Sequence, residues 1–351
     1  MMILNRSFGR AAISAALLLL NACERQGPPQ SAAAPQPAAA AAKPDTPDKS
    51  VPEWKTTDQT GRMVIAPQFD EAGVFSEGLA PVRIGGKFGF IDKQGKTVIA
   101  PQFDFATSFA EGLAAVGTGS KEGYIDHQGK FVITPDFDIA DLFTFSEGLA
   151  AIRVGDFLTG KWGYIDRQGK LAIEPQFDSA GAFSDGLAVA AVDNKWGYID
   201  KSGKFVIPAQ FASAGTFSDG LAAVRVGDVL TGKAGFIDKT GKFVIPPQFD
   251  AAFAFVNGLA DVRIGEKYGY IDKQNKRVID PKADFADSFS AGLAAVRVGD
   301  ETSGKYGFID TSGKMAVAPG FDFADLFSAS DGLAAVRMGD EKNGKYGYIA
   351  R

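Results

Sequence analysis

Acidic residues recur at two fixed positions along the chain, and paired carboxylates are the usual equipment of hydrolytic acid–base catalysis. One set precedes a Lys-Gln-Gly-Lys type of turn and comprises Asp92, Asp126, Asp166, Asp200, Asp238, Asp272 and Asp310. The other set precedes Gly-Leu and comprises Glu77, Glu111, Glu147, Asp185, Asp219 and Asp331. A catalytic pair needs two carboxylates in unequal environments, whereas repetition gives them nearly equal ones. We therefore interpret both sets as turn residues that bond backbone amides, and a carboxylate-based hydrolase is the less favoured alternative.

Arginine recurs in a Val-Arg-Val slot. This row comprises Arg83, Arg153, Arg225, Arg263, Arg297 and Arg337, with breaks at Gly117 and Asp193. Aligned guanidinium groups suit carboxylates or phosphates on a repetitive anionic polymer, so the row is the candidate ligand-binding set. The alternative, which we favour, is cross-strand pairing with nearby acids and packing of the arginine stems on aromatic rings.

A ladder of aromatic residues accompanies the arginines and comprises Phe88, Trp162, Trp196, Tyr268, Tyr306 and Tyr346. Such rings could stack on sugars. Packing between neighbouring units is the favoured interpretation, because buried aromatic side chains contribute much of the cohesion of a repeat array.

Other catalytic and cofactor-binding groups are scarce. His127 is the one histidine and occupies the turn slot of Lys93 or Arg167, so we expect a solvated turn residue. Ser-His-Asp catalysis and a histidine zinc site both lack parts. The Gly-Asp-x-x-Thr-Gly-Lys loops join two strands and do not have the context of a phosphate loop. We expect no enzymatic activity, no metal and no cofactor, and the net charge of −5 argues against nucleic acid as a partner.

These residues belong to one unit that recurs eight times. Its centre reads KFGFID at 87–92, KEGYID at 121–126, KWGYID at 161–166 and 195–200, KAGFID at 233–238, KYGYID at 267–272, KYGFID at 305–310 and KYGYIA at 345–350. A fixed period is typical of small supersecondary units that bury their apolar faces on their neighbours.

Within a unit, apolar residues alternate with a period of two. LAAIRV at 149–154, KWGYID at 161–166 and KFVI at 204–207 therefore predict three short strands in an antiparallel meander. The segment 178–184 could form one helical turn between meanders. We predict an all-β tandem array of three-stranded meanders in an open superhelix, or solenoid. A closed propeller-like ring is the alternative, but units of 34 residues are short beside the roughly 40–45 of propeller repeats.

The first 52 residues read as targeting and tether segments. Arg6 and Arg10 precede an apolar run at 11–20, so residues 1–22 are interpreted as a signal peptide. Leu20-Asn21-Ala22-Cys23 resembles a bacterial lipobox, which predicts lipidation of Cys23. Residues 23–52 are rich in Ala and Pro and predict a disordered tether. The repeat array then spans 53–351, anchored to a membrane through the lipid.

The recurring aromatic-Gly-aromatic-Ile-Asp, Gly-Lys-x-Val-Ile, PQFD and EGL motifs resemble the bacterial WG-repeat (KWG-repeat) family. The resemblance implies a β-rich array, often in surface or secreted proteins, and supplies no catalytic residues. We therefore expect a lipoprotein of the bacterial cell envelope, on the outer-membrane or periplasmic side rather than the cytoplasmic one. Its expected role is a binding scaffold for a protein or an anionic envelope polymer, and the alternative is a structural spacer without a specific ligand.

Overall fold

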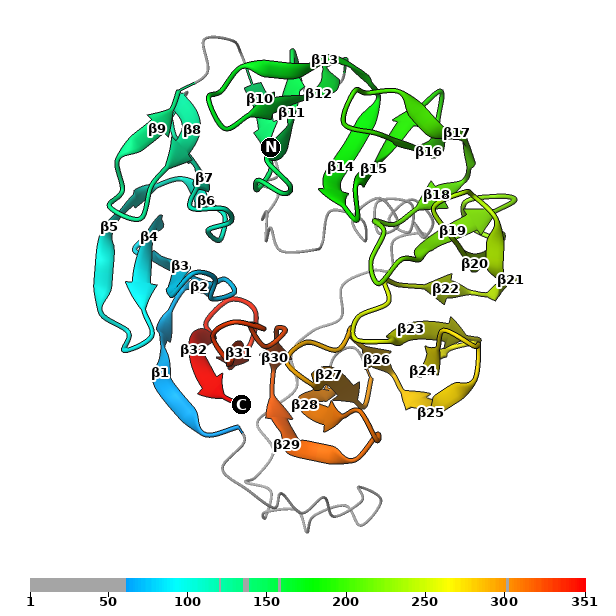
Figure 1. The fold of residues 1–351 in the computed structure, drawn as a ribbon. Coiled ribbons are helices and arrows are strands. Elements are labelled where there is room, and N and C mark those ends of the chain that lie inside the picture. The colour runs from blue at the N-terminus through cyan, green and yellow to red at the C-terminus, as the bar shows by residue number, and fades with distance from the viewer. Residues whose placement is uncertain (1–60, 120, 135–138, 157–158, 301–302) are drawn as a thin grey trace, which may run out of the picture. The chain divides into compact units, whose positions relative to one another are not determined.

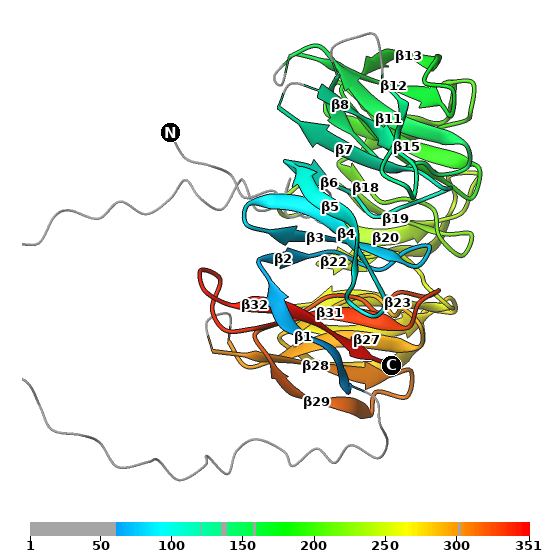
Figure 2. The same ribbon diagram turned by 90° about the vertical axis from the view of Figure 1, so that its left-hand side faces the viewer.

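Short antiparallel strands joined by tight turns make up most of the described chain. The computed structural model describes residues 61–119, 121–134, 139–156, 159–300 and 303–351. These residues form eight four-stranded sheets arranged as the blades of a closed ring, an eight-bladed β-propeller (Figure 1). Figure 2 shows the same ring from the side. No helix in the described ranges is long and apolar enough to cross a membrane.

Each blade runs from an innermost first strand to a peripheral fourth strand, and the blades are numbered 1 to 8 in chain order from β2. The first strands are β2 (Glu71–Ala72), β6 (Phe105–Ala106), β10 (Ile139–Leu142), β14 (Ser179–Ser184), β18 (Ser213–Ala214), β22 (Ala251–Ala252), β26 (Phe285–Ala286) and β30 (Phe323–Ala324). The second strands are β3 (Leu79–Ile84), β7 (Ala114–Thr118), β11 (Leu149–Val154), β15 (Leu187–Val192), β19 (Ala222–Val226), β23 (Leu259–Ile264), β27 (Leu293–Val298) and β31 (Leu333–Met338).

The third strands carry the KWGYID motif and are β4 (Lys87–Asp92), β8 (Lys121–Ile125), β12 (Lys161–Asp166), β16 (Lys195–Ile199), β20 (Lys233–Ile237), β24 (Lys267–Asp272), β28 (Lys305–Asp310) and β32 (Lys345–Ala350). The fourth strands are β5 (Thr97–Phe103), β9 (Phe131–Ile133), β13 (Leu171–Phe177), β17 (Phe205–Phe211), β21 (Phe243–Phe249), β25 (Arg277–Ala283), β29 (Met315–Phe321) and, in blade 8, β1 (Met63–Phe69).

The motif glycine of the third strand is explained by close approach of the fourth strand. A Cβ placed on Gly197 would lie 2.5 Å from the carbonyl oxygen of Ile207 and 2.7 Å from the amide nitrogen of Ala209. The register between β16 and β17 shifts at this point, between Trp196 and Tyr198, so the bulged fourth strand crosses directly over the glycine. A side chain at this position would displace backbone.

The apolar core is divided into clusters, each shared by two neighbouring blades. Between blades 1 and 2, for example, Phe90 and Ile99 of blade 1 pack with Phe109, Val116 and Ile125 of blade 2. Burial on both sheet faces explains why the second and third strands are apolar at nearly every position.

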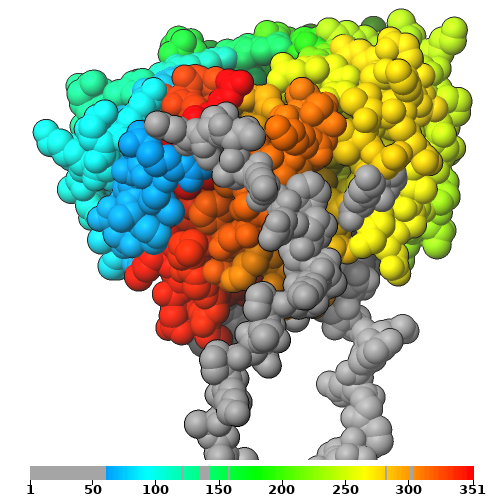
Figure 3. Space-filling model, turned by 90° about the horizontal axis from the view of Figure 1, so that it is seen from below, coloured from blue at the N-terminus to red at the C-terminus, as the bar shows by residue number. Residues whose placement is uncertain are grey.

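The ring is closed by pairing between the first and last described strands. β1 pairs antiparallel with β32, with Phe69 opposite Tyr346, and so supplies the fourth strand of blade 8. One cluster joins Ile65 and Tyr348 of blade 8 to Phe75 and Val82 of blade 1. Figure 3 shows the start of the described chain, in blue, against the last blade, in red.

The predicted all-β class and antiparallel pairing are confirmed, but the open superhelix is wrong and the alternative, a closed ring, is the observed fold. The three-stranded unit is also wrong, because each blade has four strands. The length argument failed because most first strands are only two residues long, so four strands fit in a short unit. The predicted helical turn at 178–184 is strand β14. Residues 1–22, 23–52 and 53–60, including Cys23, lie outside the described ranges.

Candidate functional site

The aspartates of the KWGYID motif cap the turn between the third and fourth strands. Asp92 accepts hydrogen bonds on Oδ1 from the backbone amides of Gln94 (3.0 Å) and Lys96 (2.9 Å). The same pair of bonds is made by Asp126, Asp166, Asp200, Asp238, Asp272 and Asp310. Their interpretation as turn residues is confirmed.

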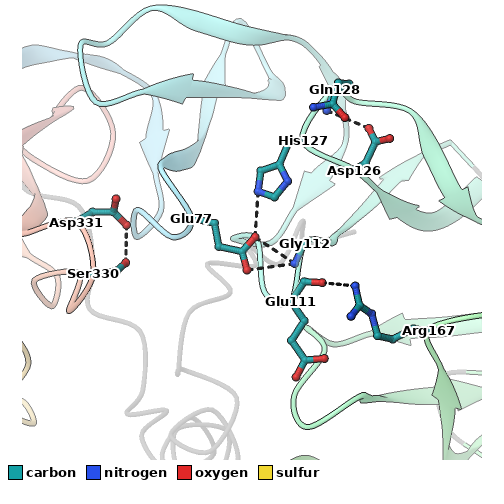
Figure 4. Close-up of polar contacts among 9 residues, drawn as sticks. All are labelled: Glu77, Glu111, Gly112, Asp126, His127, Gln128, Arg167, Ser330 and Asp331. Carbon is teal, nitrogen blue, oxygen red and sulfur yellow. Dashed lines mark hydrogen bonds and ion pairs between the residues drawn. The ribbon is translucent and has the colours of Figure 1, made fainter.

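The acids before Gly-Leu join neighbouring blades. Glu77 lies in the turn between the first and second strands of blade 1, with a left-handed φ of 55°. Both of its carboxylate oxygens accept from the amide of Gly112 in blade 2, at 3.1 Å (Figure 4). Equivalent bonds link Glu111 to Gly148, Glu147 to Gly186, Asp185 to Gly220 and Asp219 to Gly258. These acids therefore also have turn positions, and their carboxylates act as acceptors between blades.

A basic side chain from the next blade reinforces most of these contacts. His127 Nε2 lies 3.0 Å from Glu77 Oε2, and the imidazole stacks on Phe109 with ring centroids 4.3 Å apart. Arg167 donates to the carbonyl of Glu111 at 2.7 Å (Figure 4). Ion pairs also join Lys201 to Glu147, Lys273 to Asp219 and Lys93 to Asp331. His127 thus lies in the predicted turn, but it is a partner in a blade–blade contact and not simply solvated.

A second series of clamps lies at the opposite ends of the strands. Lys161, at the start of a third strand, pairs with Asp178, and Asp178 Oδ2 accepts from the amide of Asp193 in the next blade at 2.7 Å. The hydrogen bond from Lys161 holds the pKa of Asp178 below its usual value. The same ion pair joins Lys87 to Asp104, Lys233 to Asp250, Lys267 to Asp284, Lys305 to Asp322 and Lys345 to Asp70. The last of these spans the ring closure.

One groove of about 510 Å³ lies over this clamp in blades 3 and 4. It is lined by Thr159, Gly160, Lys161, Asp178, Asp193 and Asn194. Because Lys161 and Asp178 bond each other, the charged groups of the groove are already engaged in holding the blades together. Among the residues described, no cluster of three or more His, Cys, Asp and Glu side chains could hold a metal ion.

Four members of the predicted arginine row are engaged within the fold. Arg83 pairs with Glu71 at 2.6 Å and lies over Phe88. Arg153 is buried over the ring of Trp162. Arg225 is also buried and donates to the carbonyls of Gly232 and Asp250. Arg337 lies over Phe323 and Tyr346, with its guanidinium carbon 5.9 and 5.8 Å from the two ring centroids. Pairing with an acid is therefore observed for Arg83, and contact with aromatic rings for Arg83, Arg153 and Arg337, whereas Arg225 bonds backbone carbonyls instead.

The position of one break in the row is corrected. Ala191, and not Asp193, lies opposite Trp196 in β15 and β16, as Arg153 lies opposite Trp162 in the preceding blade. Asp193 belongs to the two-residue turn that follows, where it and Asn194 both have positive φ. Gly117 does occupy the arginine slot of blade 2, opposite Glu122.

The two remaining arginines differ from the rest. Neither Arg263 nor Arg297 has a side-chain hydrogen bond, an ion pair or a ring under its guanidinium group among the described residues, and the Nε atom of each is buried without a partner, as it also is in Arg83. Both are close enough to Tyr268 to lower the pKa of its hydroxyl, although burial of the ring outweighs them and the net shift is upward. Arg263 lies opposite Tyr268 across strands β23 and β24, and Arg297 belongs to the next blade.

A continuous belt of aromatic rings surrounds these arginines, and we call it the aromatic arc. It comprises Phe253, Tyr268, Phe285, Tyr306, Phe323 and Tyr346. Successive ring centroids are 6.3, 6.0, 5.9, 5.8 and 6.0 Å apart across blades 6, 7 and 8. The rings are partly exposed, Phe253 by 36%. The arc therefore offers aromatic rings beside two cations that make no ion pair with the described residues.

Three of the six residues of the aromatic arc belong to the ladder predicted from the sequence. Tyr268, Tyr306 and Tyr346 belong to the predicted ladder, whereas Phe253, Phe285 and Phe323 were missed. Trp162, a ladder member outside the arc, is buried in the core as the packing interpretation predicts. The missed phenylalanines lie on or beside first strands that are two residues long, too short to show a period. Their signal was the repeated Asp-Phe-Ala-Asp at 284–287 and 322–325.

Solved structures with a similar backbone are distant in sequence. A eukaryotic initiation factor aligns with a TM-score of 0.48 and 10% identity, over 74% of this chain and 89% of that one. Hsv2 of Kluyveromyces lactis gives 0.37 and 11%, over 82% and 98%. PorZ, a surface component of the type-IX secretion system of Porphyromonas gingivalis, gives 0.42 and 11%, over 80% of this chain and 43% of that one. At these scores, no functional argument rests on them.

No curated protein matches the sequence. The sequence profile of the WG containing repeat matches eight times in succession, at 58–88, 88–121, 123–156, 162–196, 196–229, 235–268, 268–301 and 306–346. Each match contains the third strand of one blade or part of it, with the glycine that the fourth strand crosses in most of them. The chain therefore belongs to the WG-containing repeat family.

Proposed function

We propose that this protein is a lipid-anchored binding scaffold of the bacterial cell envelope, whose propeller holds a protein or an anionic envelope polymer. The observation that carries the proposal is the pair Arg263 and Arg297, set among the rings of the aromatic arc without an ion-pair partner in the described chain. Asp250 and Asp284 are near enough to act on these two arginines electrostatically, but neither forms an ion pair with them, so the guanidinium groups can take a carboxylate or phosphate from a partner.

We propose membrane anchoring of the protein from the sequence that precedes the propeller. Leu20-Asn21-Ala22-Cys23 supplies the cysteine for lipidation, and residues 23–52 supply a tether rich in Ala and Pro. From this arrangement we propose that the propeller lies outside the cytoplasm, on the outer-membrane or periplasmic side. Replacing Cys23 with Ser is expected to move the protein from the membrane fraction to the soluble fraction. A Cys23→Ser protein that stays with the membrane would refute the anchor and leave the binding proposal standing.

We propose binding rather than catalysis because the repeated acids are already engaged. Asp92 and its equivalents bond turn amides, and Glu77 and its equivalents bond the amide of the next blade. Using any of these carboxylates as an acid or base would break a contact that supports the ring. Nucleic acid is not a proposed partner, since the chain carries a net charge of −5.

Retention on envelope extract separates binding from a purely structural spacer. The full-length protein is compared with the double variant Arg263→Gln, Arg297→Gln and with the control Lys130→Gln, Lys314→Gln. The control removes the same charge from exposed turn residues at the opposite ends of the strands. We expect the control to be retained and the arginine variant to be lost. Equal retention of all three proteins would reject these arginines as the binding site, and no retention of any would favour a spacer.

A further inference from the structure

The aromatic arc is not required to build a blade. At the first-strand position of Phe285 and Phe323, blade 2 also carries a phenylalanine, Phe105, but blades 1, 4, 5 and 6 carry Glu71, Ser179, Ser213 and Ala251. At the third-strand position of Tyr306, blade 5 carries Ala234 and blade 2 carries Glu122. These blades nevertheless have the same four strands. Because the fold tolerates Ala, Ser or Glu at these sites, packing alone does not explain six rings on one arc.

The arc combines two chemistries in a regular order. In blade 7, Phe285, Arg297 and Tyr306 lie directly opposite one another on three adjacent strands, and blade 8 repeats the row with Phe323, Arg337 and Tyr346. Tyr306 bridges the two rows, with its centroid 5.9 Å from Phe285 and 5.8 Å from Phe323. One guanidinium and two rings therefore recur per blade.

The arginines on and beside the arc differ in how many contacts their guanidinium groups make within the fold. Arg337 donates to the carbonyl of Gly339 and lies over two rings, and Arg83 in the next blade has Glu71. Arg263 and Arg297 have neither a described carboxylate nor a bond to Nε. An incoming carboxylate would give their guanidinium forks a bidentate partner in a partly desolvated setting, where such bonds are strong.

We propose that the aromatic arc binds an acidic polysaccharide of the polyuronate type, with sugar rings lying on the aromatic faces and carboxylates paired to Arg263 and Arg297. This inference rests on the proposed binding function. A polymer is favoured because ring and charge both repeat from blade to blade, so a ligand with one flat apolar face and one carboxylate per unit matches the arc repeatedly. The aromatic faces also distinguish it from a simple polyanion, which would need only cations.

The test is a calorimetric titration of the full-length protein, solubilised in detergent, with alginate oligosaccharides. A neutral glucan and poly-glutamate of matched length are the comparison ligands. We expect alginate to bind more tightly than either, and Arg263→Gln, Arg297→Gln to weaken it by at least about tenfold, since two charge-assisted contacts are lost. Lys130→Gln, Lys314→Gln should bind within about twofold of the native protein, because these lysines lie away from the arc.

The aromatic contribution is tested separately with Tyr306→Leu, which keeps an apolar side chain in the core contact. It should weaken alginate binding and leave the weaker poly-glutamate binding unchanged. Alginate binding that is unaffected by the arginine variant, or no stronger than glucan binding, would overturn the polysaccharide inference. Tight arginine-dependent binding of poly-glutamate alone would also overturn it, but would leave the proposed binding scaffold intact. Absence of binding to all three ligands, together with no retention of the native protein on envelope extract, would reject both proposals.

Discussion

Closure of the propeller ring can be tested by removing one buried hydrogen bond, the one that the Tyr348 hydroxyl makes. Tyr348 lies on the third strand of blade 8, is 0% exposed, and donates to the carbonyl of Gly73 in blade 1 at 2.7 Å. Its ring packs against Phe75 with centroids 4.8 Å apart. Burial holds the pKa of the Tyr348 hydroxyl well above its usual value, as expected for a group shielded from water. The substitution Tyr348→Phe deletes the donor and keeps the ring.

The expected cost follows from the geometry. Loss of one buried hydrogen bond, with the acceptor carbonyl left without this donor, destabilises a protein by about 1–2 kcal/mol. For a domain of this size, that lowers the melting temperature by about 2–6 °C. Phe90 occupies the equivalent position in blade 1, fully buried against Phe109, so a phenylalanine ring is sterically acceptable there.

Tyr198→Phe is the matched control, because its hydroxyl makes the same contact between consecutive blades in mid-chain, to Gly215 at 2.8 Å. In a closed ring the two interfaces are equivalent, so thermal denaturation should give equal losses for Tyr348→Phe and Tyr198→Phe. In an open array Tyr348 and Gly73, 275 residues apart, would not meet. A melting temperature lowered by Tyr198→Phe and unchanged by Tyr348→Phe would refute closure.

Three further predictions concern individual contacts. Gly197→Ala should lower the free energy of unfolding by at least about 1–3 kcal/mol, because the added Cβ meets the backbone of β17. Gly215→Ala is the control and should be close to neutral in denaturant unfolding, because the nearest atom to its Cβ is 3.6 Å away and its φ is not positive. Equal losses in the two variants would reject the role of the motif glycine. Asp178→Asn should lower the free energy of unfolding by at most about 1 kcal/mol near neutral pH, because the ion pair with Lys161 is largely exposed. Since the pKa of Asp178 is lowered in the folded protein, this contribution is present above about pH 4 and should fade as the pH falls further. A difference in stability between the two proteins that does not change with pH would contradict this. Burial raises the pKa of Tyr198, so its contribution to the free energy of unfolding should be fully present below about pH 10 and decline above it, where Tyr198 ionises in the unfolded chain. Tyr198→Phe should reduce this decline, measured as the urea midpoint across this pH range. An unchanged dependence of the urea midpoint on pH would count against it.

The local features of the fold were accessible from the sequence. Asp92 and its equivalents were read as turn caps, because Asp followed by a Gly turn has one ordinary use, and the structure has those bonds. The second and third strands were long enough to show their alternation, as in 149–154 and 161–166.

Long-range features were not accessible. Pairing of β1 with β32 joins residues about 280 positions apart, and no residue in or near 63–69 indicates which strand pairs with it. The break in the Arg83 row was placed at Asp193 because Ala191 fills the arginine slot of blade 4 and carries no charge to mark it, whereas Asp193 lies in the turn that follows. The aromatic arc depends on rings from consecutive blades approaching within about 6 Å, and the order of residues does not show how consecutive blades pack.

The central claim is that the aromatic arc is the binding surface of this propeller. Hydroxyl-radical footprinting of the full-length protein, with and without bound envelope glycan, tests it at the level of residues. The account predicts that labelling of Phe253, Tyr268 and Tyr306 falls on binding, while that of Phe131, 38% exposed on a fourth strand, does not change. Protection of Phe131 with unchanged labelling of the arc would contradict it.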